Sequence, residues 1–288
     1  MICLACKNKN FKLVLIKRNL TLVKCMKCDL VQVEGLENRF DLKHYEYYKD
    51  RIALHKNELY SDITESRYIS LLKKLEKYRE SNRLLDIGCG EGHFISVANK
   101  MKWQAMGIEK APYAAQICKK LDIDVICDDL SAINISSDYY DIITMFEVLE
   151  HLTQPREYLL KARDILRKNG ILALTTPNFN CITRKLLNIN WSWIHEEHLS
   201  YFTPKTLFWL LKECKFKIVN FDIKHITLPE LAKVFSVTKK TNNIYKRNQE
   251  IREMLESNIF LGRMKSYANK FLNVTRLGEV IECVCEKI

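Results

Sequence analysis

A short run of glycines and carboxylates, Asp86-Ile-Gly-Cys-Gly-Glu-Gly92, is the part of the sequence best suited to bind a small ligand. It follows an apolar run from Arg83 to Ile87 that is long enough for a buried strand, and it precedes a helical pattern from His93 to Met101. Glycine lets a ligand approach the backbone closely, and the start of a helix offers free N–H groups. The order strand, glycine turn, helix is therefore typical of a nucleotide site in a doubly wound α/β sheet.

The charges around this turn indicate a cationic ligand. A dinucleotide-binding turn would have glycine at position 93, where the sequence has His93. Asp86 and Glu91 would repel a pyrophosphate, but they would attract the ammonium and sulfonium groups of S-adenosylmethionine. Glu109 ends the next apolar run, about 20 residues further on, where an acidic side chain typically binds ribose hydroxyls. The alternative is a glycine turn that only shapes an α/β core.

These motifs resemble those of the class I S-adenosylmethionine-dependent methyltransferases. The run from Asp86 to Gly92 is similar to motif I of that family, and Gly107-Ile-Glu109 is similar to motif II. The resemblance covers about residues 60–228 and the final strand. It implies a Rossmann-like, doubly wound sheet of seven mostly parallel strands, and it implies that the cofactor contacts Asp86, Gly88, Gly90 and Glu109.

The adenine end of the cofactor is expected after a third strand over residues 123–127. In the methyltransferase family an acidic residue at this point holds the adenine amino group, and this chain offers both Asp128 and Asp129. Asp129 lies twelve residues before Asp141, which fits the family's spacing better. Asp129 is therefore preferred to Asp128.

The segment Tyr140–His151 reads as a fourth strand and its exit, and its Glu-Val-Leu-Glu-His ending resembles motif IV of the ubiquinone-type branch. Ligands in such sheets bind beyond the carboxyl ends of the strands, so Phe146 and Glu147 are expected to line the cofactor pocket. Glu147, Glu150 and His151 can lie on one face of the following turn. There they could bind a divalent cation or supply a base. His151 could instead cap and pack the loop.

The loop over residues 190–204 is rich in groups that could contact a methyl acceptor. His195 and His198 are the leading candidates for a general base or for acceptor binding. As a metal pair they would need Glu196 or Glu197 as a further ligand. Alternatively, the two tryptophans anchor a structural lid in which the histidines are hydrogen-bonded. The run from His198 to Pro204 resembles a segment of methyltransferases encoded with sugar and polysaccharide pathways.

Two Cys-x-x-Cys pairs near the N-terminus predict a structural zinc site. Cys3 and Cys6 are separated from Cys25 and Cys28 by 18 residues, which is the spacing of a zinc ribbon. Four thiolates can surround one Zn²⁺, and the residues between the pairs alternate as a β-hairpin does. So small a module buries little apolar surface, so the metal would supply its folding free energy. A redox function of the pairs is the competing interpretation.

The sequence predicts four parts in chain order. Residues 1–40 form the zinc-ribbon module. Residues 41–80 are an aromatic linker with a leading helix from Ser61 to Glu80. Residues 81–228 plus 277–288 form the methyltransferase domain, and 229–276 form a helical insertion. Tyr45, Tyr47 and Tyr48 in the linker either line the cofactor or acceptor pocket or attach the ribbon to the main domain.

Two boundaries of the methyltransferase domain follow from local patterns and from the resemblance. A helix that starts near Pro155 is expected to run to Lys168 and to end at Asn169-Gly170, before a strand over 171–175. The alternating run from Gly278 to Glu286 predicts the last strand. The resemblance implies that it is antiparallel and lies inside the sheet, between the fifth and sixth strands.

Charge and composition limit the partners. The net charge of the 288 residues is +11, and residues 224–276 hold eleven Lys/Arg against four Glu, a net +7. This asymmetry indicates either an acidic partner or solvated helix faces. No apolar run approaches the ~20 residues of a membrane span, and no signal peptide is visible. Several of the eleven cysteines lie in apolar patterns, as in a reduced cytoplasmic protein.

The sequence therefore predicts a cytoplasmic enzyme that transfers a methyl group from S-adenosylmethionine to a small molecule or carbohydrate. An RNA methyltransferase is the alternative, with the ribbon and the basic C-terminal segment as its RNA-binding surface. Motif IV argues against an RNA methyltransferase, because this motif lacks the Asn/Asp-Pro-Pro-aromatic signature of many base N-methyltransferases. A cofactor-binding protein without turnover is a third hypothesis. No particular oligomeric state is predicted.

Overall fold

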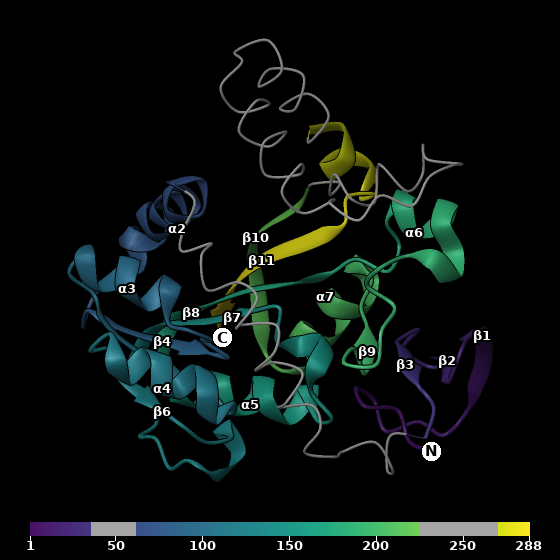
Figure 1. Ribbon diagram of the computed structural model, residues 1–288, viewed down its shortest axis with the longest axis horizontal. Helices are drawn as coiled ribbons and strands as arrows, with labels where there is room; N and C mark the ends of the chain where they lie inside the picture. The colour runs from purple at the N-terminus through teal and green to yellow at the C-terminus, as the bar shows by residue number, and fades with distance from the viewer. Residues whose placement is uncertain (36–61, 225–269) are drawn as a thin grey trace.

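The computed structural model of the protein describes residues 1–35, 62–224 and 270–288 (Figure 1). Within these ranges, a seven-stranded sheet forms the centre of the molecule, in the order β10-β11-β8-β7-β4-β5-β6. Its strands are β4 (Arg83–Ile87), β5 (Gln104–Ile108), β6 (Val125–Ile126), β7 (Tyr140–Phe146), β8 (Leu166–Pro177), β10 (Phe216–Lys224) and β11 (Val280–Lys287). The predicted tyrosines 45, 47 and 48, and the insertion up to residue 269, lie outside the described residues.

The pairing of the strands confirms the predicted fold class. Strands β4 to β8 pair in parallel, whereas β11 pairs antiparallel with both β8 and β10. Figure 1 shows β11, in yellow, beside β10 although the two strands are far apart in the chain. The last strand therefore lies between the fifth and sixth strands, as expected. Strands buried on both faces read as continuous apolar runs, and β7 is buried over nearly its whole length.

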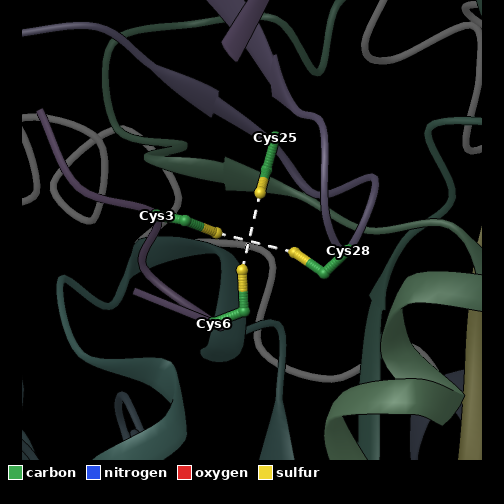
Figure 2. A group of neighbouring side chains, drawn as sticks. All are labelled: Cys3, Cys6, Cys25 and Cys28. Atoms are coloured by element: carbon green, nitrogen blue, oxygen red, sulfur yellow. Dashed lines mark hydrogen bonds between the residues drawn. The ribbon is translucent and has the colours of Figure 1, made fainter. Parts of the chain in front are cut away.

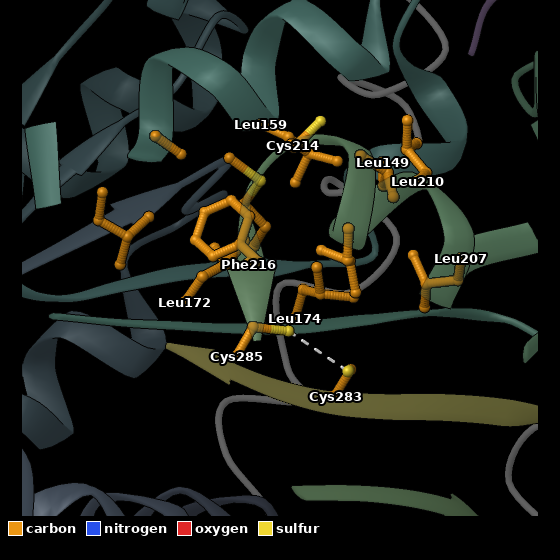
Figure 3. Close-up of a cluster of buried hydrophobic side chains, with 14 of the residues drawn as sticks. Leu149, Leu159, Leu172, Leu174, Leu207, Leu210, Cys214, Phe216, Cys283 and Cys285 are labelled. Atoms are coloured by element: carbon orange, nitrogen blue, oxygen red, sulfur yellow. Dashed lines mark hydrogen bonds between the residues drawn. The ribbon is translucent and has the colours of Figure 1, made fainter. Parts of the chain in front are cut away.

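Helices cover both faces of the sheet because successive side chains of a strand point to opposite faces. Leu84 and Ile142 belong to the apolar cluster of α2 and α3, and Leu85 and Ile143 to the cluster of α5 and α7 on the other face. Figure 3 shows the second cluster, where Leu159 and Leu210 lie among strand residues. The helices are α2 (Asp62–Leu75), α3 (His93–Lys100), α4 (Pro112–Lys120), α5 (Pro155–Ile165), α6 (Ile182–Leu187) and α7 (Pro204–Glu213).

The predicted bounds of two elements in this domain are wrong. Helix α5 ends at Ile165 rather than at Lys168, and β8 begins directly at Leu166. Leu166 already pairs with Tyr140 of β7, and the register shifts before the pair Ile142–Ile171. The guanidinium Nε of Arg167 lies 2.7 Å from the Asp141 carboxylate and draws the segment toward β7. This long-range ion pair overrides the local helix pattern. The third strand is also shorter than expected, because β6 covers only Val125–Ile126.

A second sheet joins the N-terminal module to the loop after β8. Strands β1 (Phe11–Lys17), β2 (Leu20–Cys25) and β3 (Val31–Val33) form antiparallel pairs. The fourth strand is β9 (Ser200–Tyr201), which pairs with β3. Figure 1 shows β9 adjacent to the N-terminal strands. Short 3₁₀ helices complete the described structure: η2 (Glu76–Tyr78), η3 (Leu130–Ala132), η4 (Leu149–His151) and η5 (Asn188–Asn190).

Candidate active site and cysteine cluster

The carboxyl ends of β4 and β7 meet where the strand order of the sheet reverses, which is the usual ligand site of an open α/β sheet. The turn after β4 is made by glycines with positive φ, +72° at Gly88 and +55° at Gly90. A Cβ atom at Gly88 would lie 2.5 Å from Val148 Cγ2, so only glycine lets the turn pack against the exit of β7. A Cβ atom at Gly90 would meet no atom within 4 Å. Gly90 therefore faces open space.

The carboxylate of Glu109 connects this turn to the end of β5. Its Oε2 accepts a hydrogen bond from Gly90 N at 2.8 Å, and its Oε1 accepts one from Ala111 N at 2.7 Å. Each carboxylate oxygen can accept a second hydrogen bond. Glu109 can thus shape the turn and still accept hydrogen bonds from ribose hydroxyls.

The carboxylate of Asp86 is buried at the end of β4. It accepts a hydrogen bond of 2.6 Å from the hydroxyl of Thr144, on the neighbouring strand β7. Burial, followed by the charge of Glu109, raises the pKa of Asp86 to about 7. A cationic ligand beside this carboxyl group would offset the cost of its burial. The acidic turn therefore fits the ammonium and sulfonium charges of S-adenosylmethionine.

The two predicted adenine-binding carboxylates differ in their surroundings. Asp129 caps η3, accepts hydrogen bonds from the amide and hydroxyl of Ser131, and lies 3.2 Å from Lys110 Nζ. Burial alone would raise the pKa of Asp129, but the hydrogen bonds from Ser131 lower this pKa to about 2. The exposed Asp128 accepts a hydrogen bond of 2.7 Å from the amide of Asp129. The preferred residue of the pair is therefore held ionised.

An aromatic group lines the exit of β7. The ring of Phe146 packs edge-on against Phe94 with centroids 5.1 Å apart, and Phe94 packs in the same way against Tyr68 of α2 at 5.2 Å. Burial, and then the charges of Asp86 and Glu147, raise the pKa of Tyr68 to about 12. The sequence pattern had indicated only that Tyr68 belongs to the apolar side of a helix. No local signal marks it as a site residue.

The three histidines predicted to be catalytic lie together. The ring centroids of His151 and His198 are 4.8 Å apart, and those of His195 and His198 are 3.9 Å apart. Glu150 lies beside them with its side chain 1% exposed. Burial, and then the charge of Glu147, raise the pKa of Glu150 to about 8. Two segments that are distant in the chain thus form one polar cluster beyond the end of β7.

The backbone of Glu147, directly after β7, is strained. Its φ is +55°, an uncommon value for a residue other than glycine, and its amide donates to the carbonyl of Thr175 at 3.0 Å. The side chain is exposed, in contrast to that of Glu150. Glu147 is thus directed toward solvent at the mouth of the site.

The four predicted metal ligands of the N-terminal module converge on one point (Figure 2). The Sγ atoms of Cys3, Cys6, Cys25 and Cys28 all lie within 4.8 Å of one another. The pairs Cys3–Cys28 and Cys6–Cys25 are both 3.5 Å apart. Four thiolates about 2.3 Å from a central zinc ion would be similarly spaced. The cluster therefore has the ligand types and the size for one tetrahedral Zn²⁺.

The seven-stranded sheet and the acidic glycine turn, residues 86–92, have the architecture of the class I S-adenosylmethionine-dependent methyltransferases. The model of a family described as "Methyltransferase domain" matches residues 60–220, more than half of the chain. The chain belongs to this methyltransferase-domain family.

Curated relatives share moderate identity with the central part of the chain. A ubiquinone biosynthesis O-methyltransferase of Cereibacter sphaeroides is 25% identical over 147 residues, covering 46% of this chain and 60% of the relative. A mitochondrial ubiquinone biosynthesis O-methyltransferase of Schizosaccharomyces pombe is 30% identical over 124 residues, covering 38% of this chain and 45% of the relative. The chain thus spans about half the length of these relatives.

Solved structures share the fold. An S-adenosylmethionine-dependent methyltransferase of Archaeoglobus fulgidus superposes with a TM-score of 0.55 at 17% identity, over 82% of this chain and 98% of its own. A possible histamine N-methyltransferase of Thermotoga maritima gives a TM-score of 0.52 at 16% identity, over 85% of this chain and 97% of its own. At such identities the likeness extends to the fold alone. No helix in the described ranges is both long and apolar enough to cross a bilayer.

Proposed function

We propose that this protein transfers a methyl group from S-adenosylmethionine to a hydroxyl oxygen of a small molecule. The observation that carries the proposal is the cluster of His151, His195 and His198 beyond the end of β7. Val148, three residues before His151, packs against Gly88 of the acidic glycine turn. The relatives named as ubiquinone biosynthesis O-methyltransferases support a small-molecule hydroxyl as the acceptor. A carbohydrate hydroxyl, predicted from the run after His198, belongs to the same chemical class.

The cofactor, when bound, supplies a methyl group made electrophilic by a sulfonium. Asp86 would attract its ammonium group, and Glu109 would accept hydrogen bonds from the ribose hydroxyls. Asp129 or Asp128 would contact the adenine amino group. The rest of the cofactor surface would contact the turn at Gly88 and Gly90. It would also contact the side chains of Phe146 and Glu147. These residues hold the methyl group in line with the acceptor, which is the main requirement of a displacement at carbon.

A hydroxyl acceptor must also lose its proton. His151, His195 and His198 lie close enough together to orient a hydroxyl group and to accept its proton. Both η4, which follows β7, and the loop before β9 contribute to this cluster. Methylation of an oxygen therefore requires the two segments in one arrangement.

The N-terminal module is proposed to hold one structural zinc ion through Cys3, Cys6, Cys25 and Cys28. None of the eleven cysteines forms a disulfide, as is usual for a protein of a reducing compartment such as the cytoplasm. Purified protein should contain about one tightly bound zinc atom per chain. Metal analysis of protein kept under reducing conditions tests this stoichiometry, and a ribbon that remains folded without metal would contradict it.

Transfer of label from S-[methyl-³H]adenosylmethionine tests the proposed function. The purified chain is incubated with small-molecule, glycan and RNA fractions of a cell extract, and each fraction is counted. Label should enter the small-molecule or glycan fraction as an alkali-stable methyl ether. Cofactor binding without transfer to any fraction would instead favour a protein that only binds the cofactor.

RNA is the alternative acceptor, and one surface feature favours it. A cavity of about 570 Å³ lies between the N-terminal module, the loop after β8 and the start of α7. Its lining includes Lys12, Lys24, Lys205 and Arg276. Asp29 neutralises part of this charge, because it lies 3.4 Å from Lys24 Nζ and 2.6 Å from Lys205 Nζ. Incorporation of label into RNA that weakens steeply with salt would establish this alternative.

A further inference from the structure

The basic cavity beside the N-terminal module is built from parts of the chain that are far apart in sequence. Strands β1 to β3 and the turn between β2 and β3 supply one side, and the loop after β8 and the start of α7 supply another. Its lining lies within residues 12–31, 179–180, 203–205 and 276. A volume of about 570 Å³ is in the range of pockets that hold small molecules. The cavity therefore exists only when the module is docked on the main sheet.

Positive charge dominates this cavity. Lys12, Lys24, Lys205 and Arg276 line it. Asp29 is the one carboxylate among the lining residues, all of which belong to the described part of the chain. Four cations and one carboxylate give these side chains a net charge of +3. Cations that converge in one cavity repel one another, so an anionic ligand would be attracted to it.

The carboxylate of Asp29 holds two of these lysines together. It lies 3.4 Å from Lys24 Nζ and 2.6 Å from Lys205 Nζ. The hydrogen bond from Lys205, and that from Lys24, lower the pKa of Asp29 against a small opposing effect of burial. An ammonium group has three N–H donors, so each lysine can contact Asp29 and still donate to a ligand. Asp29 thus positions two ammonium groups beside each other.

The turn that carries Asp29 belongs to the cysteine cluster. Asp29 directly follows Cys28, one of the four cysteines that converge in Figure 2. Its φ is +62°, and its amide donates to the carbonyl oxygen of Cys25 at 3.1 Å. Aspartate is among the few residues that adopt a positive φ with little strain. The proposed zinc site would therefore fix the direction of Asp29 and, through it, one wall of the cavity.

The opposite wall offers a guanidinium group and the start of a helix. The guanidinium of Arg276 lies over the rings of Phe221 and Phe208, 5.3 and 5.9 Å from their centroids. Such stacking leaves the N–H donors at the edge of the plane, where they can form two parallel hydrogen bonds to a phosphate. Thr203 and Pro204, at the amino end of α7, also line the cavity. The partial positive charge of this helix end adds to the field of the cations.

The aromatic part of the lining favours a small molecule over RNA. Proteins that bind single-stranded nucleic acid stack its bases on accessible aromatic rings. Phe179 is the one aromatic residue of the described lining, and it is 7% exposed. Arg184 lies over its ring at 4.1 Å, and the ring of Tyr201 packs against it at 5.3 Å. Phe179 therefore offers no stacking surface to a base.

We propose that this cavity binds the phosphate group of a small molecule. A phosphate monoester carries about −1.5 to −2 charges near neutral pH and has three acceptor oxygens, which suits several converging cations. Lys12, Lys205 and Arg276 would donate to these oxygens, and Val14 and Val31 of the lining would contact the remainder of the ligand. The inference goes beyond the proposed function and does not depend on it. The ligand is either the methyl acceptor itself or a separate effector with the same phosphate chemistry.

Calorimetric titration of zinc-loaded full-length protein with inorganic pyrophosphate tests the site. One saturable site per chain is expected, with an affinity that falls as salt is added. Lys12→Gln and Lys205→Gln should each weaken binding about fivefold or more, because a charge-assisted hydrogen bond is lost. Both side chains are exposed, so neither change threatens the fold. Lys120→Gln is the matched control, since this exposed lysine ends α4, outside the cavity, and its affinity should equal that of the wild type.

Two results of these titrations would overturn the proposal. One is the absence of saturable pyrophosphate binding in the wild type, and the other is equal binding in the wild type, Lys12→Gln and Lys205→Gln. A fluorescent single-stranded RNA of about twelve nucleotides is titrated in parallel. RNA that binds more tightly than pyrophosphate, and that loses this binding in the two variants, would replace the small molecule as the ligand.

Methyl transfer to extract fractions distinguishes the two sources of the phosphate. Inhibition by pyrophosphate that more of the fraction relieves would identify the acceptor, and a change in rate that persists would identify an effector. Transfer that saturating pyrophosphate leaves unchanged would overturn both. Affinities for S-adenosylhomocysteine should be equal in the wild type, Lys12→Gln and Lys205→Gln. A wild type that binds pyrophosphate but not S-adenosylhomocysteine would refute the proposed function and leave this site in place.

Discussion

At the scale of single residues, Glu109 combines a structural role with a proposed binding role. Its two oxygens hold the amides of Gly90 and Ala111, which belong to the glycine turn and to the start of α4. Loss of this carboxylate would release the turn and also remove the proposed ribose contact. Replacement of Glu109 is therefore expected to weaken cofactor binding in two ways at once.

The substitution Glu109→Ala should lower the affinity for S-adenosylhomocysteine about tenfold or more, since hydrogen bonds to a charged group contribute about 1.5–3 kcal/mol each. Isothermal titration calorimetry measures the change. Asp124→Asn is the matched control, because this exposed carboxylate precedes β6 at the opposite end of the strands. An unchanged affinity in Glu109→Ala would refute the cofactor assignment.

Asp86 makes cofactor binding depend on pH. Burial and then the charge of Glu109 raise its pKa to about 7, so it is largely protonated in mildly acidic solution without ligand. A cationic ligand favours the ionised form, so binding should release a proton and tighten as the pH rises toward about 7. The affinity of Asp86→Asn for the cofactor should be lower than that of the wild type, and it should not rise with pH. Calorimetry between about pH 5.5 and 7.5 tests both variants, and a flat profile in the wild type would contradict the mechanism.

At the scale of secondary-structure elements, Asp141 connects three segments at the start of β7. It accepts hydrogen bonds from the amides of Glu80, Ser81 and Asn82, just before β4, and from the guanidinium of Arg167 at the start of β8. Burial alone would raise the pKa of Asp141, but the backbone amide of Glu80 and the side chain of Arg167 lower this pKa. The parallel core is therefore held together by a carboxylate at the amino ends of its strands.

Replacement of Asp141 by Asn should lower the free energy of unfolding by about 2–4 kcal/mol at neutral pH, because the change leaves buried donors poorly paired. The pKa of Asp141 is depressed in the folded state. Its contribution is therefore present above the unfolded value of about 4 and is lost as the pH falls through the folded value. Urea unfolding at several pH values measures this effect. The exposed Asp164→Asn is the control, and equal losses of stability in both variants would contradict the assignment.

At the scale of the whole molecule, the N-terminal module supports the loop that carries His198. Strand β9 completes the N-terminal sheet through its pairing with β3. Trp191 is fully buried in a cluster that includes Leu22 and Val33 of that sheet. Lys17 Nζ also donates to the carbonyl oxygen of Ile194 at 2.7 Å. The predicted lid is thus anchored by its tryptophan.

Weakening the cysteine cluster should therefore reduce turnover more than cofactor binding. Cys6→Ser is expected to lower kcat about tenfold or more, since a displacement of about 1 Å at a catalytic group can cost a hundredfold. Its affinity for S-adenosylhomocysteine should change less than about twofold, because the glycine turn lies on another sheet. The exposed Cys127→Ser is the control. A parallel loss of both properties would show a general loss of folding instead.

The sequence by itself determined the elements and the residue types that carry local signals. Glycines at 88, 90 and 92, the acidic ends of β4 and β5, and the paired Cys-x-x-Cys turns all depend on neighbours within a few residues. Burial of complete strands makes β4 and β7 readable as apolar runs from short-range spacing alone. The place of β11 inside the sheet was predicted correctly from the resemblance to the methyltransferase family, because a local pattern shows that a strand exists but not where it pairs.

Only the tertiary structure decided which distant segments meet. It packed Tyr68 against Phe94, which contacts Phe146, brought His198 to Glu150 and His151, and added β9 to the N-terminal sheet. It also ended α5 at Ile165, because the strand pairing at Leu166 and the ion pair between Arg167 and Asp141 outweigh local helix propensity. Such contacts depend on the packing of whole elements, and no spacing along the chain encodes them.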